Sequence, residues 1–485
     1  MIDTEALRKK VIDLAIRGKL TEQLPSDGDA ETLYAQIQEE KAKLVKEGKI
    51  KKDKPLPEIT EDEIPFEIPK NWKWVRIGEI ARVYGGKRIP AGRSLTLEDT
   101  GYKYIRVSDM KNRTIITETL QFVPKDIYPS ISRYIINKED VYITVAGTIG
   151  KVGKIPEEID GANLTENADR LVFNFLSQDW LIWCLSSLLI QKQIEQLTTQ
   201  VAQPKLAIKR IQEFALPLPP IDEQNRIAKV IDKVYKQTDI IDELQSKYSN
   251  DLAVLKSKII DAGIQGKLTE QLLEDGDAET LYVQIQEEKA RLIQEGKIKK
   301  EKPLPDISVD EIPFEIPKNW KWVRFGVTTF IERGGSPRPI KSYITDSEDG
   351  INWIKIGDVE KGGKYIYSTK EKIIPEGEKK SRHVYPGDFL LTNSMSFGRP
   401  YISKVEGCIH DGWLLIRDLN GFSADYLYYL LSSRYMYGQF CNKASGATVD
   451  NLNIDKVNTA MIPLPPLNEQ KRIASKIEAI LEYLQ

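Results

Sequence analysis

The chain has 485 residues, 41% of them hydrophobic, which is enough for two or three domains with their own cores. A formal net charge of −2 excludes a uniformly basic DNA-binding protein, so any DNA affinity must come from local patches or a partner. Three widely separated cysteines argue against a disulfide framework and favour the cytoplasm, and the charged N-terminus lacks the apolar core of a signal peptide.

The first predicted elements belong to a block that occurs twice. Residues 12–76 recur as residues 260–324, with identical stretches such as GKLTEQL and GDAETLY, and each copy ends in EIPFEIPKNWKWVR. Within the block, residues 29–47 and 277–295 are predicted to form a short helix rich in Glu, Lys and Gln. A framework repeated almost unchanged is expected to do one structural job twice.

Two divergent inserts, residues 77–215 and 325–461, follow the repeated blocks. They share only a skeleton: Gly85-Gly86-Lys87 aligns with Gly334-Gly335-Ser336-Pro337, and YKYIRVSDM from Tyr102 aligns with INWIKIGDV from Ile351. Each has short β-rich runs and ends in one apolar helix, so each is predicted to be an α+β globule. The inserts are mildly basic and the framework is acidic, which modestly favours DNA binding by the inserts.

A long helix is predicted to begin after Pro219-Pro220 and to end near Gly263 and Gly266. Its apolar residues, from Ile227 to Ile259, are mostly three or four positions apart, which indicates an amphipathic or coiled-coil stripe. About 40 residues at ~1.5 Å each give a rod of roughly 60 Å, and we interpret it as one half of a helix pair that acts as a spacer.

The repeat is permuted. Residues 462–485 match residues 216–239, the start of the long helix, and the block from about Thr4 matches its end from Leu252. We therefore predict an α+β, pseudo-twofold, circularly arranged protein whose second long helix is split between the chain ends. The predicted boundaries are an N-terminal helical segment (1–55), a first globular domain (56–215), a central helical region (216–302), a second globular domain (303–461) and a C-terminal helix (462–485).

The sequence lacks the usual catalytic motifs. It has no Gly-x-Gly for a dinucleotide or S-adenosylmethionine loop, and no Asn/Asp-Pro-Pro-aromatic tetrapeptide of amino-methyltransferases. Cys408 and His410, with Cys441, could hold zinc, but the first half has nothing comparable. We therefore expect no catalytic residue, no metal site and no cofactor in this chain.

The junction signature carries a family resemblance. Pro-Leu-Pro-Pro-x-x-Glu-Gln-x-Arg-Ile, at residues 217–227 and 463–473, resembles the junction between a target-recognition domain and a conserved helix in Type I restriction–modification specificity subunits. The paired glycines at Gly85 and Gly334, and EIPFEIPKNWKWVR before each insert, are also similar to that family. The first copy departs from it by reading Gly-Gly-Lys-Arg where the family usually has Gly-Gly-x-Pro.

The resemblance implies a division of labour. Each target-recognition domain would read one half of a split, asymmetric double-stranded DNA site, while antiparallel helices fix the gap and dock two methyltransferase subunits. S-adenosylmethionine and adenine methylation would belong to those subunits. ATP and Mg would belong to a motor-nuclease restriction subunit where one is present.

Candidate DNA-contacting residues are basic or polar side chains in the inserts, because such groups read base edges and bind phosphates. The glycine-flanked loops 147–153 and 393–398 are expected to approach a strand closely. In the first insert the candidates are Lys87, Arg88, Arg106, Lys111, Thr148, Lys151 and Lys205, and in the second Arg338, Lys341, Lys355, Asn393, Ser394, Ser396 and Arg399.

Two rival functions remain open at this point. A fused endonuclease–methyltransferase is disfavoured by the missing motifs, and methyl transfer by the isolated chain would reveal it. A coiled-coil scaffold that binds protein partners through two globules is disfavoured by the duplicated Pro-Pro-x-x-Glu-Gln signature, and a DNA-binding assay would distinguish it.

Overall fold

The computed structural model describes residues 1–198, 205–360, 362–393, 397–442 and 452–484. The chain divides into two compact units, residues 1–246 (unit 1) and residues 247–485 (unit 2), each of which contains one of the divergent inserts. Among the described residues, no helix is long and apolar enough to cross a membrane.

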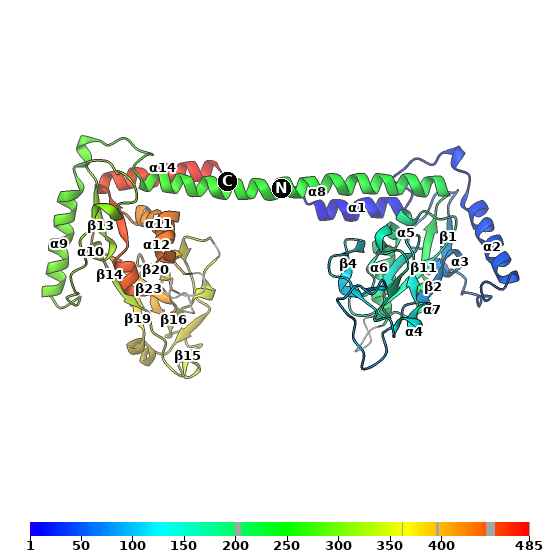
Figure 1. Ribbon diagram of the computed structural model, residues 1–485. Helices are drawn as coiled ribbons and strands as arrows, with labels where there is room; N and C mark the ends of the chain where they lie inside the picture. The colour runs from blue at the N-terminus through cyan, green and yellow to red at the C-terminus, as the bar shows by residue number, and fades with distance from the viewer. Residues whose placement is uncertain (199–204, 361, 394–396, 443–451, 485) are drawn as a thin grey trace. The chain divides into compact units, whose positions relative to one another are not determined.

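The long helix is confirmed: α8 spans Ile221–Ile264. In unit 1, α1 (Thr4–Ile16) lies along its first half (Figure 1). Thr4 bonds to Asp242 at 2.5 Å and Arg8 to Thr238 at 2.7 Å, whereas Arg226 near the start of α8 bonds to Asp27 at 2.5 Å. As the residue number rises from Thr4 to Asp27, the number of its partner on α8 falls from Asp242 to Arg226, so α1 and α8 run antiparallel.

Unit 2 builds the same helix pair from other parts of the chain. There α14 (Leu467–Tyr483) lies against the end of α8 (Figure 1), where a Cβ on Gly263 would lie only 2.6 Å from Ile477. Arg472 of α14 bonds to Asp275, as Arg226 bonds to Asp27 in unit 1. Thus α1 corresponds to the second half of α8, and α14 to its first half. The predicted circular arrangement is confirmed within each unit, while a common line for α1 and α14 stays a prediction.

The predicted apolar stripe of α8 is buried only in part. Ile227 and Ile231 are buried, and Ile264 near the other end is fully buried. Leu244 and Tyr248, in the middle of the stripe, are 59% and 64% exposed. The predicted amphipathic stripe is therefore buried near both ends of the helix and exposed at Leu244 and Tyr248.

The framework helices α2 (Ala30–Lys46) and α9 (Ala278–Gln294) confirm the predicted short helices. Each begins at an aspartate whose carboxylate accepts a hydrogen bond from the third residue on, Asp29 from Thr32 N–H and Asp277 from Thr280 N–H. Such caps pair an N–H that the first turn leaves unsatisfied.

Both inserts are α+β, as predicted, and each carries two main sheets. In unit 1 the first sheet has the strand order β2 (Arg82–Gly85), β11 (Ala168–Val172), β8 (Val141–Thr144), β9 (Val152–Lys154). The second sheet has the order β6 (Gln121–Phe122), β3 (Lys103–Ile105), β10 (Ala162–Leu164), β7 (Ile135–Ile136). In unit 2 the first sheet has the strand order β14 (Thr329–Arg333), β23 (Trp413–Asp418), β20 (Phe389–Thr392), β21 (Pro400–Ser403), β17 (Tyr365–Ile366). The second sheet has the order β15 (Ile344–Thr345), β18 (Glu371–Ile373), β16 (Ile351–Ile354), β22 (Gly407–Ile409), β19 (Arg382–Val384).

The two repeated signatures meet in a short antiparallel ladder that closes each insert. β1 (Lys73–Arg76) pairs with β12 (Ala215–Leu218), and β13 (Lys321–Arg324) pairs with β24 (Met461–Leu464) in the same register. The remaining short elements are β4 (Met110–Lys111), β5 (Thr114–Ile115), α3 (Ile77–Ile80), α4 (Tyr128–Ile131), α7 (Ile208–Glu213), α10 (Phe325–Thr328) and α13 (Ile454–Asn458).

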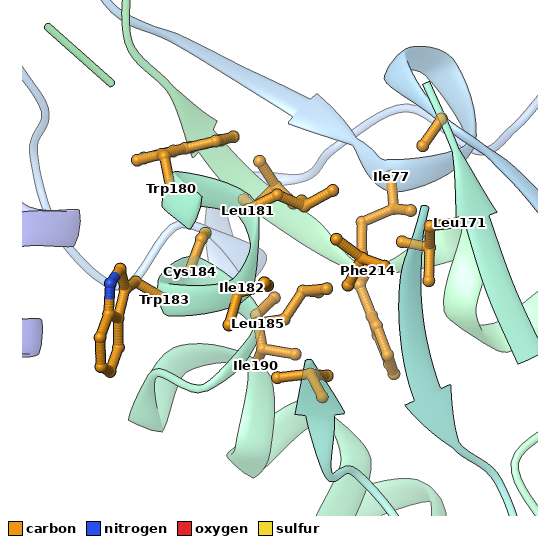
Figure 2. Packing of buried hydrophobic residues seen from close by; sticks show 14 of the residues in the cluster. Ile77, Leu171, Trp180, Leu181, Ile182, Trp183, Cys184, Leu185, Ile190 and Phe214 are labelled. Atoms are coloured by element: carbon orange, nitrogen blue, oxygen red, sulfur yellow. The ribbon is translucent and has the colours of Figure 1, made fainter. Parts of the chain in front are cut away.

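The core of unit 1 is built around α5 (Gln178–Leu185), whose residues from Trp180 to Leu185 are all buried (Figure 2). A helix that is apolar all round must be enclosed, and Ile77, Leu171 and Phe214 pack in the same cluster. Each insert was predicted to end in one apolar helix, which is wrong because the helix breaks at Ser186-Ser187 and at Ser433. Two helices result in each unit: α5 with α6 (Leu188–Thr198), and α11 (Ala424–Ser432) with α12 (Arg434–Asn442).

Candidate nucleic-acid interface

The Glu-Gln of the junction signature fastens each recognition domain to its helix pair. Glu223 is fully buried and accepts hydrogen bonds from the Trp72 indole and the Gln23 amide, both at 2.8 Å. Glu469 is equally buried and accepts from the Trp320 indole at 2.8 Å. Several donors satisfy each buried carboxylate, as burial of such a group requires.

The glutamine that follows makes a second repeated link. Gln224 accepts a hydrogen bond from the Ser177 N–H at 2.9 Å, where α5 begins, and Gln470 accepts from the Ser423 N–H at 2.9 Å, where α11 begins. The signature therefore orients the apolar helix of each recognition domain on the helix pair.

The two predicted loops connect the strands of equivalent β-hairpins, β8–β9 and β20–β21, and the described residues next to each loop, called here the hairpin tip, are held in the same way. In unit 1, Thr144 at the end of β8 accepts a hydrogen bond on its hydroxyl from the Lys151 N–H at 2.9 Å. In unit 2, Thr392 at the end of β20 accepts one from the Arg399 N–H at 3.0 Å. The threonine N–H groups donate back to the carbonyls of Lys151 and Arg399, at 2.8 and 3.1 Å. These contacts place a basic residue at the same point of each tip.

A cationic pocket lies beside each hairpin tip. In unit 1 a pocket of about 490 Å³ is lined by Lys111, Arg113 and Lys151, and in unit 2 one of about 550 Å³ is lined by Arg399 and Arg434. No described Asp or Glu lines either pocket. Arg434 also bonds to Asp261 at 2.9 Å, outside the pocket lining. A concave surface lined by cations attracts polyanions, and phosphates provide most of the affinity in DNA binding.

The two pockets differ in the chemistry of their walls. Gln191 lines the first pocket and Tyr437 lines the second. Each lies two residues before a glutamine that forms hydrogen bonds with the short antiparallel ladder closing its domain. Those anchors are Gln193, which bonds both ways to the first residue of β12, and Gln439, which does the same with β24. Equivalent backbone positions thus present different groups, as expected of two surfaces that read different bases.

Arg113 is a pocket residue that the sequence prediction missed. Its guanidinium stacks between Trp183, 4.2 Å from the ring centroid, and Tyr235 of α8, 4.7 Å away, and its burial lowers its pKa from the ordinary arginine value. Its φ of +61°, beside Asn112 at +52°, turns the chain between β4 and β5. The Asn112-Arg113 pair alone does not predict this turn, and the residues on which Arg113 stacks are distant in sequence, so the sequence contains no signal for this residue.

Several other predicted residues form a second group, at the turns that follow the first strand of each domain and at those that follow β3 and β16. Gly86 and Gly334 are the equivalent positions there, because a Cβ would lie 2.0 Å from the Thr165 carbonyl oxygen and 2.1 Å from that of His410. The predicted alignment of Gly85 with Gly334 is therefore wrong by one residue. Arg88 corresponds to Ser336, and the departure from the family's Gly-Gly-x-Pro pattern lies in this turn.

Most cationic side chains of this second group form ion pairs with carboxylates of the same domain. Arg88 bonds to Glu166 at 2.6 Å, which raises the pKa of its guanidinium, and exposed Arg338 lies 3.5 Å from Asp411. Arg106 and Lys355 occupy equivalent turns after β3 and β16. Arg106 bonds to Asp109 at 2.8 Å and Lys355 to Glu371 at 2.5 Å. Lys87 and Lys341 are exposed in the same region.

The other candidates have separate outcomes. Asn393 is 2% exposed and its amide donates to the Asp411 carbonyl oxygen at 2.8 Å, so its expected role at a base edge is corrected to a structural one. Thr148 is exposed at the first hairpin tip, and Lys205, which is also exposed, bridges to Ala146 of the same tip. Ser394 and Ser396 lie outside the described residues.

Comparisons with known proteins agree with this arrangement. The family model described as "Type I restriction modification DNA specificity domain" matches residues 69–247 and 317–484. The EcoEI specificity subunit of Escherichia coli is 27% identical over 97% of this chain and 88% of its own length. The EcoAI specificity subunit, also from Escherichia coli, is 30% identical over 66% of this chain and 61% of its own length.

Solved structures show the same fold. A chain from a study titled "Structural basis underlying complex assembly and conformational transition of the type I R-M system" aligns with a TM-score of 0.62 at 19% identity, covering 87% of this chain and 92% of its own. The HsdS subunit of Thermoanaerobacter tengcongensis aligns with a TM-score of 0.51 at 18% identity and the same coverage. The protein therefore belongs to the family of Type I restriction modification DNA specificity domains, as a specificity subunit with two DNA-recognition domains.

Proposed function

We propose that each recognition domain presents its hairpin tip and adjoining pocket to double-stranded DNA, so that the two domains read the two halves of a bipartite, asymmetric site. The observation that carries this proposal is the repeated basic position at the tip, Lys151 in one unit and Arg399 in the other, beside pockets of the same location and different lining. Equal placement favours one mode of docking, and unequal chemistry favours two different sequences.

The catalytic work falls to partners in this proposal. Two methyltransferase subunits dock on the helix pairs, bring S-adenosylmethionine and methylate an adenine in each half-site. A motor-nuclease subunit, where present, supplies ATP- and Mg-dependent cleavage. The specificity chain itself contributes no cofactor and no reacting group, and it works in the cytoplasm, where its DNA is. The helices set the gap between the half-sites.

Substitutions at the two tips test the proposal. Arg399→Ala should weaken discrimination between right and wrong bases in one half-site by about 1–3 kcal/mol if the guanidinium forms hydrogen bonds with a guanine base. Lys151→Ala should affect only the other half-site. Binding to DNA duplexes with single base changes, measured at several salt concentrations, separates base reading from phosphate contact, which would instead lower the salt dependence for all sequences.

Lys299→Ala is the matched control: Lys299 is an exposed residue of the repeated framework, in the segment that follows α9, and its replacement should leave the half-site preferences unchanged. If both tip variants bind every duplex as the parent chain does, the hairpin tips are not the reading surface.

The purified chain alone should neither methylate nor cleave DNA, and methylation should appear when a partner methyltransferase is added. The reason is the absence from the sequence of a cofactor glycine loop and of the catalytic tetrapeptide. Transfer of labelled methyl groups from S-adenosylmethionine to DNA measures this. Transfer by the chain on its own, at a rate that follows its concentration through purification, would contradict the assignment.

A further inference from the structure

Unit 2 contains a cluster of metal-ligating side chains away from the hairpin tip. His383 on β19 lies directly opposite Cys408 on β22 in the antiparallel register, and Glu378 lies in the short helical turn Pro375–Lys380 that precedes β19. One ligand atom from each of the three residues lies within 4.8 Å of the others. Side chains opposite each other on an antiparallel pair start close together, so the strand pairing itself brings imidazole and thiol into one place.

The hydrogen bonds of His383 resemble those of a metal ligand. Its Nδ1 faces Glu378 Oε1 at 2.6 Å, and its Nε2 lies 2.9 Å from Glu406 Oε1. A histidine that binds a metal through one ring nitrogen commonly donates the other N–H to a carboxylate, which fixes the tautomer. Glu406 is placed for that second role, while Glu378 lies on the Nδ1 side.

We propose that Glu378, His383 and Cys408 bind a zinc ion, which ties the edge strand β19 to β22 and to the preceding turn. One sulfur, one nitrogen and one oxygen donor suit this borderline-soft cation, with water as the fourth ligand. In a tetrahedral site these atoms would lie roughly 3.3–3.6 Å apart, so small side-chain rotations close the site. On binding, the thiol proton passes to solvent and the thiolate becomes the ligand.

The same strand pair in unit 1 shows that the fold does not require these residues. There, β7 and β10 pair Ile135 with Asn163 at the corresponding positions, and neither forms such a ligand set. The sequence analysis considered Cys408 with His410 and Cys441. In the structure His410 is occupied elsewhere, because the backbone nitrogens of Ile356 and Gly412 lie 3.1 and 2.8 Å from its Nε2 and Nδ1.

Cobalt titration of the full chain, first treated with a chelator, tests the site. We expect about one Co²⁺ per chain, with a thiolate-to-cobalt charge-transfer band and the visible bands of a tetrahedral ion, both removed by Zn²⁺. His383→Gln should abolish the signal without creating a cavity, and Cys408→Ser should abolish the charge-transfer band. Glu406→Gln should weaken binding by about 10–100-fold, as loss of a supporting carboxylate does elsewhere.

Cys441→Ser, a change at the half-buried cysteine outside the cluster, is the control and should keep both bands. Zinc should also raise the melting temperature of the parent chain and not that of His383→Gln. The absence of cobalt bands in the parent chain would overturn the proposal and leave His383 as a hydrogen-bonding link between two carboxylates. Bands that survive His383→Gln would equally overturn it.

Discussion

Deleting residues 1–20 should unfold the helix pair of unit 1 and leave unit 2 folded. The deleted segment includes α1, which buries Val11, Ile12, Ala15 and Ile16 in the core of unit 1. Burial of Ile12 and Ile16 alone is worth roughly 3–6 kcal/mol, a large fraction of the ~5–15 kcal/mol that holds an ordinary domain together. Without α1, Ile227 and Ile231 of α8 would lose part of their cover.

The measurement is thermal unfolding combined with hydrogen exchange along α8. The thermal transition of unit 1 should lower its midpoint or disappear, and amides near residues 227–238 should lose protection while those near 259–264 keep it. If both transitions and the exchange pattern stay as in the full chain, α1 does not stabilise unit 1.

The permuted repeat offers matched point variants for the same question. Ile16 in α1 and Ile264 in α8 occupy equivalent places, at 4% and 0% exposure. Ile16→Ala and Ile264→Ala should each destabilise their own unit by about 2–5 kcal/mol, because each leaves a cavity in a packed helix interface. An effect of either variant on the other unit would mean that the two units do not unfold separately.

Local patterns in the sequence predict the helical framework well. The periodicity after Pro219-Pro220, the Glu-, Lys- and Gln-rich runs and the offset between the two framework copies lead to α8, α2 and α9 and to the split helix. These features depend on neighbours three or four residues apart, so one sequence contains the needed information. The break between α5 and α6 escapes that logic, because the apolar run continues from Leu181 through Ser186-Ser187 to Ile190 with no proline or glycine to mark a helix end.

The candidate site is less predictable because it depends on pairings between distant segments. The sequence correctly singles out the two glycine-flanked loops as related, and the structure makes them equivalent hairpin tips. It cannot tell that Asn393 turns inward, that Arg113 stacks on Trp183, or that Cys408 faces His383 and not His410. Strand register determines the last of these contacts, and a slip of one residue would send the His383 side chain to the other face of the sheet.

Exchanging residues 77–215 for the matching insert of a relative should change one half of the recognised DNA site and leave the other half and the gap unchanged. The cut points fall at the inner end of the β1–β12 ladder, so the framework strand Lys73–Arg76 and residues 216–218 of its partner remain in place. The insert also rests on α8: the Trp183 indole donates to Asp232 at 2.9 Å and its ring lies 4.4 Å from that of Tyr235.

A suitable donor insert therefore carries an aromatic residue at the position of Trp183, and a folded product is verified by an unchanged thermal transition of unit 2. Methylome sequencing of a host that expresses the exchanged chain with its methyltransferase reads the outcome directly. Exchange of residues 325–461 is the reciprocal control and should change only the other half-site. Because the helices remain those of the parent chain, a shift in the gap after either exchange would assign spacing to the inserts, and a change in both half-sites would contradict two independent recognition domains.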